Sequence, residues 1–181
     1  MLKPQDIVVT LRLLLAEKRG EKTTYPLLSA WTGLSASEAH AAIRRAVKAG
    51  LVSNTLRESG TGFDWTVVRA ALEEFTNHAV RYLWPVELGA EQRGVPTGWS
   101  VNGLNDGPNA VLEGGSWVWK SPTGAVRGAD VKPLYPSVPE AAGRDPLFHQ
   151  SLAAIDLARA PNSRLRRLGT EWLQSHALRK S

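Results

Sequence analysis

The feature that most constrains the fold is the pattern of apolar residues, glycines and caps between Leu27 and Trp65. A short apolar helix should stop at Gly33, because glycine commonly ends helices in the left-handed conformation. A second helix should begin at Ser35 and extend to Gly50. The residues that follow look like the first strand of a β-hairpin. The sequence therefore predicts two helices joined by a tight turn and followed by a hairpin.

The second predicted helix, residues 35–50, has one apolar face and one polar face. Ser35 and Glu38 fit a capping box, in which the hydroxyl and the carboxylate satisfy backbone donors at the helix start. At about 100° per residue, the stripe that faces the core contains Ala39, Ile43, Ala46 and Val47. The opposite face contains Ser37, Ala41, Arg44 and Lys48, flanked by His40 and Arg45. A cationic face of this kind is either a solvated surface or a binding surface.

The order of these signals resembles the winged helix–turn–helix of bacterial transcriptional regulators of the MarR type, over roughly the first third of the chain. The resemblance implies that the second helix lies in the major groove of DNA. Arg44 is the first candidate for reading a base, because arginine binds guanine O6 and N7 in bidentate fashion. Arg45 and Lys48 are better interpreted as phosphate contacts, which position the protein without reading sequence. The other residues expected to face the bases are Ser37, His40 and Ala41.

Two flanking segments supply the remaining expected DNA contacts. The resemblance places Thr24 and Tyr25 where such proteins commonly touch the phosphate backbone, although an ordinary solvated loop with Thr24 as a helix cap is the alternative. Gly60 and Gly62 allow a tight connection between the two strands of the hairpin. Arg57 lies near the tip of this hairpin, where a wing usually meets the DNA backbone.

Positive charge concentrates at the two ends of the chain. Residues 1–57 contain nine Lys or Arg against four Asp or Glu, and residues 161–181 contain five against one. Residues 58–160 contain eight against twelve, so the middle is acidic although the whole chain has a net charge of +5. This distribution is the electrostatic footprint expected of a DNA-binding protein.

The first helix should begin at Pro4, which suits the first helical position because proline lacks the unneeded donor. It has two apolar seams. The core stripe contains Ile7, Val8, Leu11, Leu14 and Leu15, and a second, nearly opposite seam contains Val9, Leu13 and Ala16. A surface helix needs only one apolar face, so the second seam requires another contact. The chain's own C-terminal helices and a second subunit are equal alternatives.

The rest of the chain is expected to form a connecting amphipathic helix over 66–84 and a C-terminal extension over 85–181. Eight of the eleven prolines and ten of the sixteen glycines fall in residues 85–146, which argues against long regular elements there. Residues 116–121 alternate as a strand does, and residues 125–128 are expected to pair back as a short hairpin. Two helices should close the chain, the first after Asp145 and the second after Asn162 or Ser163. Residues 126–146 also look like a segment of small, uncharacterised bacterial proteins that begin with a winged helix.

Three tryptophans in this extension, Trp99, Trp117 and Trp119, admit two interpretations. They can stabilise a segment that lacks long elements, which we favour. They can also line a pocket for a small effector or contact a protein partner.

Several function classes lack their usual signals. The chain has no cysteine, so disulfides and thiolate metal sites are ruled out. We find no phosphate-binding glycine loop, no nucleophile elbow and no pair of histidines at metal-ligand spacing, so we expect no enzyme activity, cofactor or metal. The apolar runs are too short to span a membrane, and the N-terminus lacks a signal-peptide core, so a cytoplasmic protein is expected.

The predicted fold is mainly α with a small β component, divided into a winged helix–turn–helix over 1–65, the helix over 66–84 and the extension over 85–181. The predicted function is sequence-specific binding of duplex DNA by a homodimer that regulates transcription. One alternative is a protein-interaction module or antitoxin whose C-terminal half binds a protein partner. The other is a regulator that senses an effector through the tryptophan-lined pocket.

Overall fold

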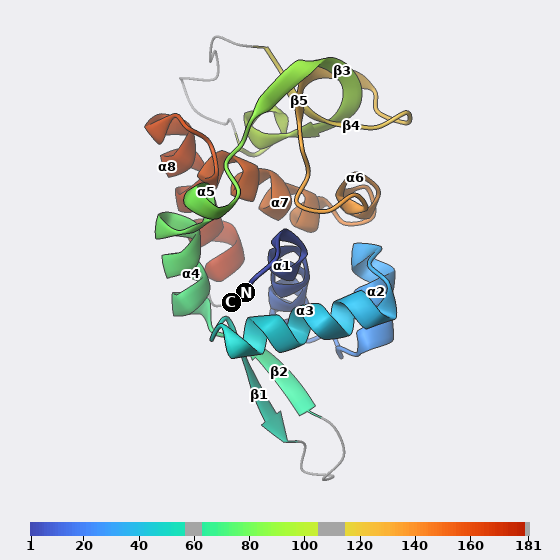
Figure 1. The fold of residues 1–181 in the computed structure, drawn as a ribbon, viewed down its shortest axis with the longest axis vertical. Helices are drawn as coiled ribbons and strands as arrows, with labels where there is room; N and C mark the ends of the chain where they lie inside the picture. The colour runs from blue at the N-terminus through green and yellow to red at the C-terminus, as the bar shows by residue number, and fades with distance from the viewer. Residues whose placement is uncertain (57–62, 105–114, 180–181) are drawn as a thin grey trace.

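The computed structural model describes residues 1–56, 63–104 and 115–179 of the chain (Figure 1). The protein is mainly α-helical with a small β component. The helices are α1 (Pro4–Lys18), α2 (Tyr25–Thr32), α3 (Ala36–Lys48), α4 (Arg69–His78), α5 (Val80–Leu83), α6 (Val138–Ala142), α7 (Pro146–Ala158) and α8 (Ser163–Trp172), with a 3-10 turn η1 (Gly98–Ser100) and a π-helical segment η2 (Leu173–Leu178). The strands are β1 (Val52–Leu56), β2 (Phe63–Val67), β3 (Leu88–Thr97), β4 (Trp117–Lys120) and β5 (Val126–Val131).

Helix α1 lies at the centre of the core and begins at Pro4, as predicted. It packs against α2, α3 and β2 from the N-terminal part of the chain. It also packs against α7 and η2 from the C-terminal part (Figure 1). The second seam, Val9, Leu13 and Ala16, is at most 1% exposed. Of the two alternatives for this seam, the chain's own helices are therefore correct. The seam leaves no apolar surface for a second subunit.

Helices α2 and α3 are joined at Gly33, which has a left-handed φ of +72°. A Cβ atom at this position would also lie 2.7 Å from Cβ of Ser137, in the segment that leads into α6. Glycine is thus required here both by the turn and by close packing. Ser35 caps α3 by accepting a hydrogen bond from Glu38 N at 3.1 Å, which confirms the predicted start of this helix.

Strands β1 and β2 form the predicted antiparallel hairpin, with Val52 opposite Val67 and Asn54 opposite Trp65. The expected helix over 66–84 is wrong at its start, because Thr66 and Val67 belong to β2 and the helix begins at Arg69. It is also interrupted at Ala79, between α4 and α5. β-Branched residues such as Thr66 and Val67 favour strands, and their pairing with β1 places the start of the helix after them. β2 therefore ends at Val67, two residues beyond the predicted limit of the N-terminal unit.

Strands β3, β4 and β5 close into a small barrel. The expected hairpin of residues 116–121 with 125–128 is wrong, since β4 and β5 run parallel and β3 pairs antiparallel with both. β3 has ten residues, so the glycines and prolines did not exclude a long element. Instead, some glycines permit the close crossing of strands. A Cβ at Gly94 would lie 2.1 Å from the carbonyl oxygen of Trp119, and one at Gly128 would lie 2.3 Å from that of Ser116.

Helix α7 joins the barrel to α1, and it is capped by Asp145 as predicted (Figure 1). Its Asp156 is buried and accepts hydrogen bonds at 2.7 Å from both Thr97 Oγ1 and Trp119 Nε1. Arg159 lies 3.4 Å from the same carboxylate, and burial raises the pKa of Asp156 despite these partners. This buried network fixes the barrel on the helical layer.

Two kinds of feature are absent from the described residues. No helix among them combines the length and the apolar composition that a membrane crossing requires. Within the same part of the chain, no three His, Asp or Glu side chains gather as metal ligands would.

Candidate functional site

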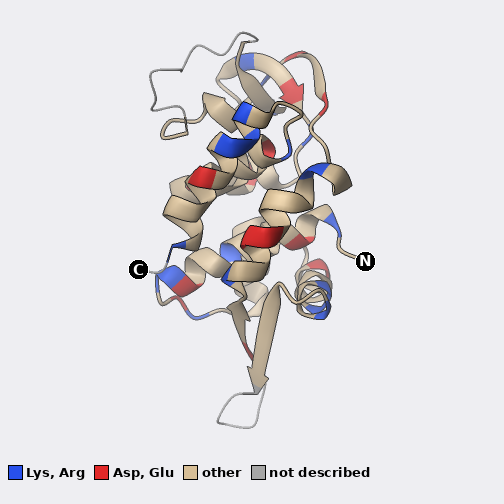
Figure 2. Ribbon diagram, turned by 90° about the vertical axis from the view of Figure 1, so that its left-hand side faces the viewer, with Lys and Arg blue, Asp and Glu red and all other residues tan. Residues whose placement is uncertain are grey.

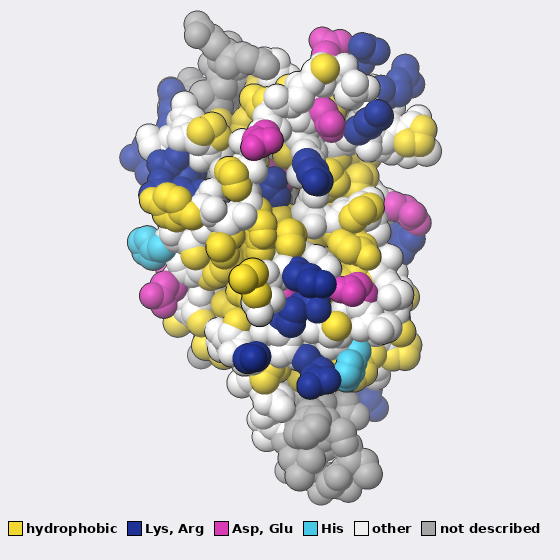
Figure 3. All heavy atoms as spheres, in the orientation of Figure 1, with side chains coloured by type: hydrophobic (Ala, Val, Ile, Leu, Met, Phe, Trp, Pro, Cys, Tyr) yellow, Lys and Arg dark blue, Asp and Glu magenta, His cyan; other side chains and the backbone are white. Residues whose placement is uncertain are grey.

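The predicted outer face of α3 is largely exposed. Ser37, Arg44 and Lys48 are exposed and Ala41 is half-buried, while Ala39, Ile43 and Ala46 are buried beneath them. Lys, Arg and His side chains gather over α3, immediately above the hairpin (Figure 3). The hairpin β1–β2 projects from the helical body beside this face (Figure 2). The amphipathic pattern of α3 therefore orients a small-residue end and a cationic end on one surface.

Arg44 and Lys48 are the free cations of this face. Neither forms a hydrogen bond or an ion pair with another residue that the structure describes, although Arg44 lies close enough to Tyr25 to influence its hydroxyl. Arginines elsewhere in the first fifty residues are paired: Arg12 with Glu21 at 2.9 Å and Arg19 with Asp145 at 2.6 Å. Among the described arginines of this region, Arg44 is therefore the one without a carboxylate partner in the described residues, whereas Arg12, Arg19 and Arg45 are held in ion pairs.

Arg45 borders this face but differs from Arg44 and Lys48 because it is paired. Its Nε and Nη2 bind the carboxylate of Asp6 at 2.7–3.0 Å, and Nη2 also lies 3.3 Å from Glu38. The hydrogen bond with Asp6 raises the pKa of Arg45. Asp6 is fully buried at the start of α1 and also accepts a hydrogen bond from Lys3 N at 2.8 Å. Arg45 is therefore engaged in an ion pair that fixes α3 on α1, and its phosphate contact stays a prediction.

Thr24 and Tyr25, at the start of α2, both have structural contacts within the chain. Thr24 caps α2 by accepting a hydrogen bond from Leu27 N at 3.3 Å, which is the alternative interpretation of this residue. Tyr25 packs its ring between two others. Its centroid lies 4.8 Å from that of His40, edge to face, and 4.6 Å from that of Trp65. Burial raises the pKa of the Tyr25 hydroxyl.

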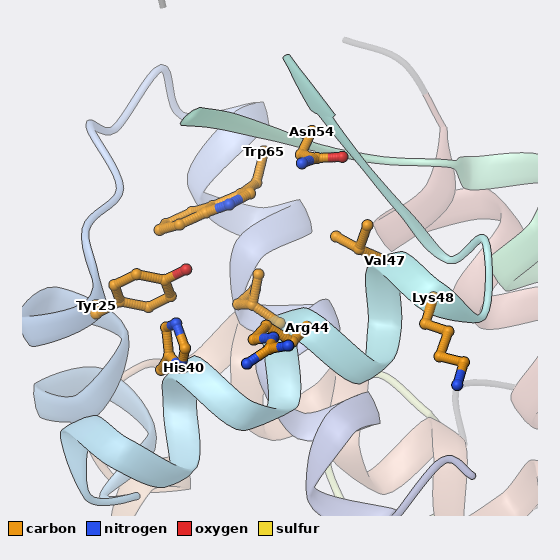
Figure 4. Close-up of a pocket in the computed structure, with 8 residues that line it drawn as sticks. Tyr25, His40, Arg44, Val47, Lys48, Asn54 and Trp65 are labelled. Atoms are coloured by element: carbon orange, nitrogen blue, oxygen red, sulfur yellow. The ribbon is translucent and has the colours of Figure 1, made fainter. Parts of the chain in front are cut away.

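A hollow of about 370 Å³ opens between α3 and the hairpin (Figure 4). Figure 4 shows Tyr25, His40 and Trp65 on one side of it, Val47 and Lys48 on the other, and Arg44 between them. The full lining consists of Tyr25, His40, Ile43, Arg44, Val47, Lys48, Asn54 and Trp65. A second hollow of about 300 Å³ lies along α3 and is lined by His40, Ala41, Arg44, Arg45 and Lys48. His40, Arg44 and Lys48 thus line both hollows.

Trp65 and Asn54 are residues of this surface that the sequence analysis did not single out. They lie opposite each other in the hairpin, so both side chains are on the same face of the two strands. The alternation of Trp65 and Val67 with polar Asp64 and Thr66 was the available signal. Arg57, expected at the tip of the hairpin, lies outside the described residues.

The hairpin is fixed to α1 through Glu17. The Glu17 carboxylate accepts a hydrogen bond from Val67 N at 2.6 Å and lies 3.8 Å from Arg69. Burial raises the pKa of this carboxyl, and the hydrogen bond from Val67 and the positive charge of Arg69 oppose the shift. α1 therefore positions both parts of the surface, α3 through Asp6 and the hairpin through Glu17.

The three tryptophans of the C-terminal half lie in the core or against it. Trp117 is 4% exposed and Trp119 is 1% exposed, and both belong to the core, against which Trp99 packs. The hollow of about 440 Å³ in this half is lined by Pro96, Ser100, Val101, Asn102, Val126, Pro146, His149 and Gln150, and by none of the three. The burial of Trp117 and Trp119 therefore favours the interpretation that these residues stabilise the barrel.

Comparisons of the chain with protein-family models, with curated proteins and with solved structures give no match. The interpretation of the surface rests on its own residues and contacts.

Proposed function

We propose that α2, α3 and the hairpin β1–β2 form a winged helix–turn–helix that binds duplex DNA and regulates transcription. The observation that carries the proposal is that Arg44 and Lys48 are exposed on the outer face of α3 and have no ion pair with any residue in the described part of the chain. α3 spans 13 residues, about 20 Å at 1.5 Å per residue, which is long enough to enter the major groove. The hairpin extends beside the helix, as a wing does.

The side chains on this face suit different parts of a DNA site. Ser37 and Ala41 are small, so they allow the backbone of α3 to approach the base edges. Arg44 can donate two hydrogen bonds to a guanine, and Lys48 can contact a phosphate. His40 borders the same face, and Tyr25 supports it from α2. Arg45 is not needed for the proposed contacts, because its charge is paired with Asp6.

The direct test is selection of bound sequences from a random duplex pool, followed by fluorescence anisotropy on the selected site. We expect Arg44→Ala to weaken binding by about 5- to 100-fold and to relax the preference at one base pair, the magnitude of a lost bidentate contact. Arg164→Ala is the matched control, because it removes one exposed positive charge from α8. If the wild-type protein binds no duplex at low salt, or if the double variant R44A/K48A binds as tightly as wild type, the proposal is wrong.

The expected homodimer stays a proposal of its own. Two copies would read two half-sites about one helical turn apart, roughly 34 Å. Since the second seam of α1 is buried within one chain, the dimer would have to use another surface. Sedimentation velocity with the selected duplex measures the stoichiometry, and a 1:1 complex on a palindromic site would contradict the dimer.

A further inference from the structure

The hollow between α3 and the hairpin has an aromatic and aliphatic wall, which contacts with phosphates do not require. Three of its lining residues are aromatic, and Tyr25 and Trp65 are half-buried with ring centroids 4.6 Å apart. Val47 and Ile43 add aliphatic surface. A wall of this kind attracts a flat, apolar group by stacking and by burial of apolar area.

The rim of the same hollow is cationic and polar. Arg44 and Lys48 line it without a partner among the described residues, and Asn54 contributes an exposed amide from β1. A ligand with a flat ring and a covalently attached anionic group would contact the aromatic wall and the cations at the same time. A purely apolar ligand would leave the cations unused, and an inorganic anion would leave the rings unused.

We infer that this hollow binds a single unstacked nucleotide. Its base stacks against Trp65 and Tyr25, its phosphate pairs with Lys48, and the Asn54 amide donates to or accepts from the base edge. The volume of about 370 Å³ falls in the range of small-ligand pockets, roughly 300–1,000 Å³. The inference rests on the proposed function in one respect: the nucleotide would come from DNA that α3 already holds.

An unpaired nucleotide is the expected source. Unstacking a paired base costs a few kcal/mol, and the cost is least for a base that has no partner. A duplex with one unpaired base beside the site of α3 should therefore bind more tightly than a continuous duplex. A free mononucleotide has the same chemistry, and it is the alternative source.

The test compares three duplexes that carry the selected site: a continuous duplex, one with a single-nucleotide bulge, and one with an abasic bulge. The abasic bulge keeps the extra sugar and phosphate but has no base, so it is the matched control. We expect the base-containing bulge to bind on the order of tenfold more tightly than the abasic one, since one base–aromatic stack contributes this much. A 2-aminopurine in the bulge should lose fluorescence on binding as it stacks. Competition by dAMP and dTMP at millimolar concentration measures the free-nucleotide source.

Two substitutions of one residue separate stacking from packing. Trp65→Leu keeps an apolar side chain and removes the aromatic face, and it should abolish the difference between the two bulges. Trp65→Phe keeps an aromatic face and should retain most of it. Thermal unfolding of each variant checks that it folds. If neither variant folds, the comparison of the two bulges with the wild-type protein still tests the inference.

The outcomes are distinct for the two proposals. Equal binding of both bulges, together with no saturable binding of dAMP or dTMP, would overturn the nucleotide site while leaving duplex binding intact. Saturable mononucleotide binding that Trp65→Leu removes would support the site and assign it to a free ligand. Loss of duplex binding altogether contradicts the proposed function, whatever the bulges show.

Discussion

The two halves of the molecule use the same residue types in different ways. In the C-terminal half, Trp119, Asp156 and Arg159 meet in a buried network, and Trp119 is 1% exposed. In the N-terminal half, the buried pair of Asp6 and Arg45 holds α3 from beneath. On the outer face, Arg44 and Lys48 have no hydrogen-bond or ion-pair partner among residues 1–56, 63–104 and 115–179. Residue type alone therefore does not identify a binding site. A cation or an aromatic ring can bind a ligand only where other residues already hold the fold together.

Breaking the pair beneath α3 should have the largest effect. Arg45→Met leaves the Asp6 carboxylate buried without its charged partner, and removing one member of a buried pair typically costs about 3 kcal/mol or more. Urea unfolding measures the free energy of unfolding. We expect Arg44→Ala, one residue earlier, to change it by less than about 0.5 kcal/mol. Equal losses in the two variants would contradict the distinction between the paired and the free arginine.

The double substitution D6L/R45M sharpens the same comparison. Replacing both members with apolar residues removes the uncompensated charge, so stability should recover toward the wild-type value. The double-mutant cycle then gives the coupling energy of the pair. A double variant as unstable as Arg45→Met would show that the loss came from packing and not from charge.

The tryptophans provide the second comparison. Trp119→Phe removes the indole donor from Asp156 and leaves a cavity beside it, so it should lower the free energy of unfolding by about 2 kcal/mol. Trp65→Phe, at a half-buried position where the indole has no hydrogen bond to a residue that the structure describes, should cost less than about 1 kcal/mol. Thermal unfolding of the two variants measures this contrast, which fails if Trp65→Phe is the more harmful change.

A smaller effect is expected from His149, which hydrogen bonds the Pro96 carbonyl at 2.7 Å on the barrel side of α7. Burial lowers the pKa of His149. Below its unfolded pKa, about 6.5, the unfolded chain binds a proton that the folded state resists. Stability should therefore fall as pH decreases from about 6.5 toward the folded pKa. The variant His149→Gln should lack this component, as urea unfolding between pH 7.5 and 5 would show; an identical pH dependence would contradict the assignment.

The sequence predicted the elements that local signals determine. Pro4, Gly33 and Ser35 mark helix boundaries through backbone geometry and caps, and the structure agrees with each of them. The predicted outer face of α3 is exposed for the same reason, because a helical period fixes which residues share a face.

Long-range contacts account for what the sequence missed. The ion pair of Arg45 joins residues 39 positions apart, and no periodicity indicates it. The parallel pairing of β4 with β5 depends on β3, whose glycines and prolines concealed a strand. The aromatic wall of the hollow likewise assembles Tyr25, His40 and Trp65 from three separate elements.

The central claim is that the outer face of α3 binds DNA through free cations. Its most direct test is the dependence of the binding constant on salt for wild type, Lys48→Ala and Arg164→Ala. We predict a steep decrease of log K with log salt for wild type, a slope shallower by about 1 for Lys48→Ala, and an unchanged slope for Arg164→Ala. Identical slopes for wild type and Lys48→Ala, or a change confined to Arg164→Ala, would contradict the account.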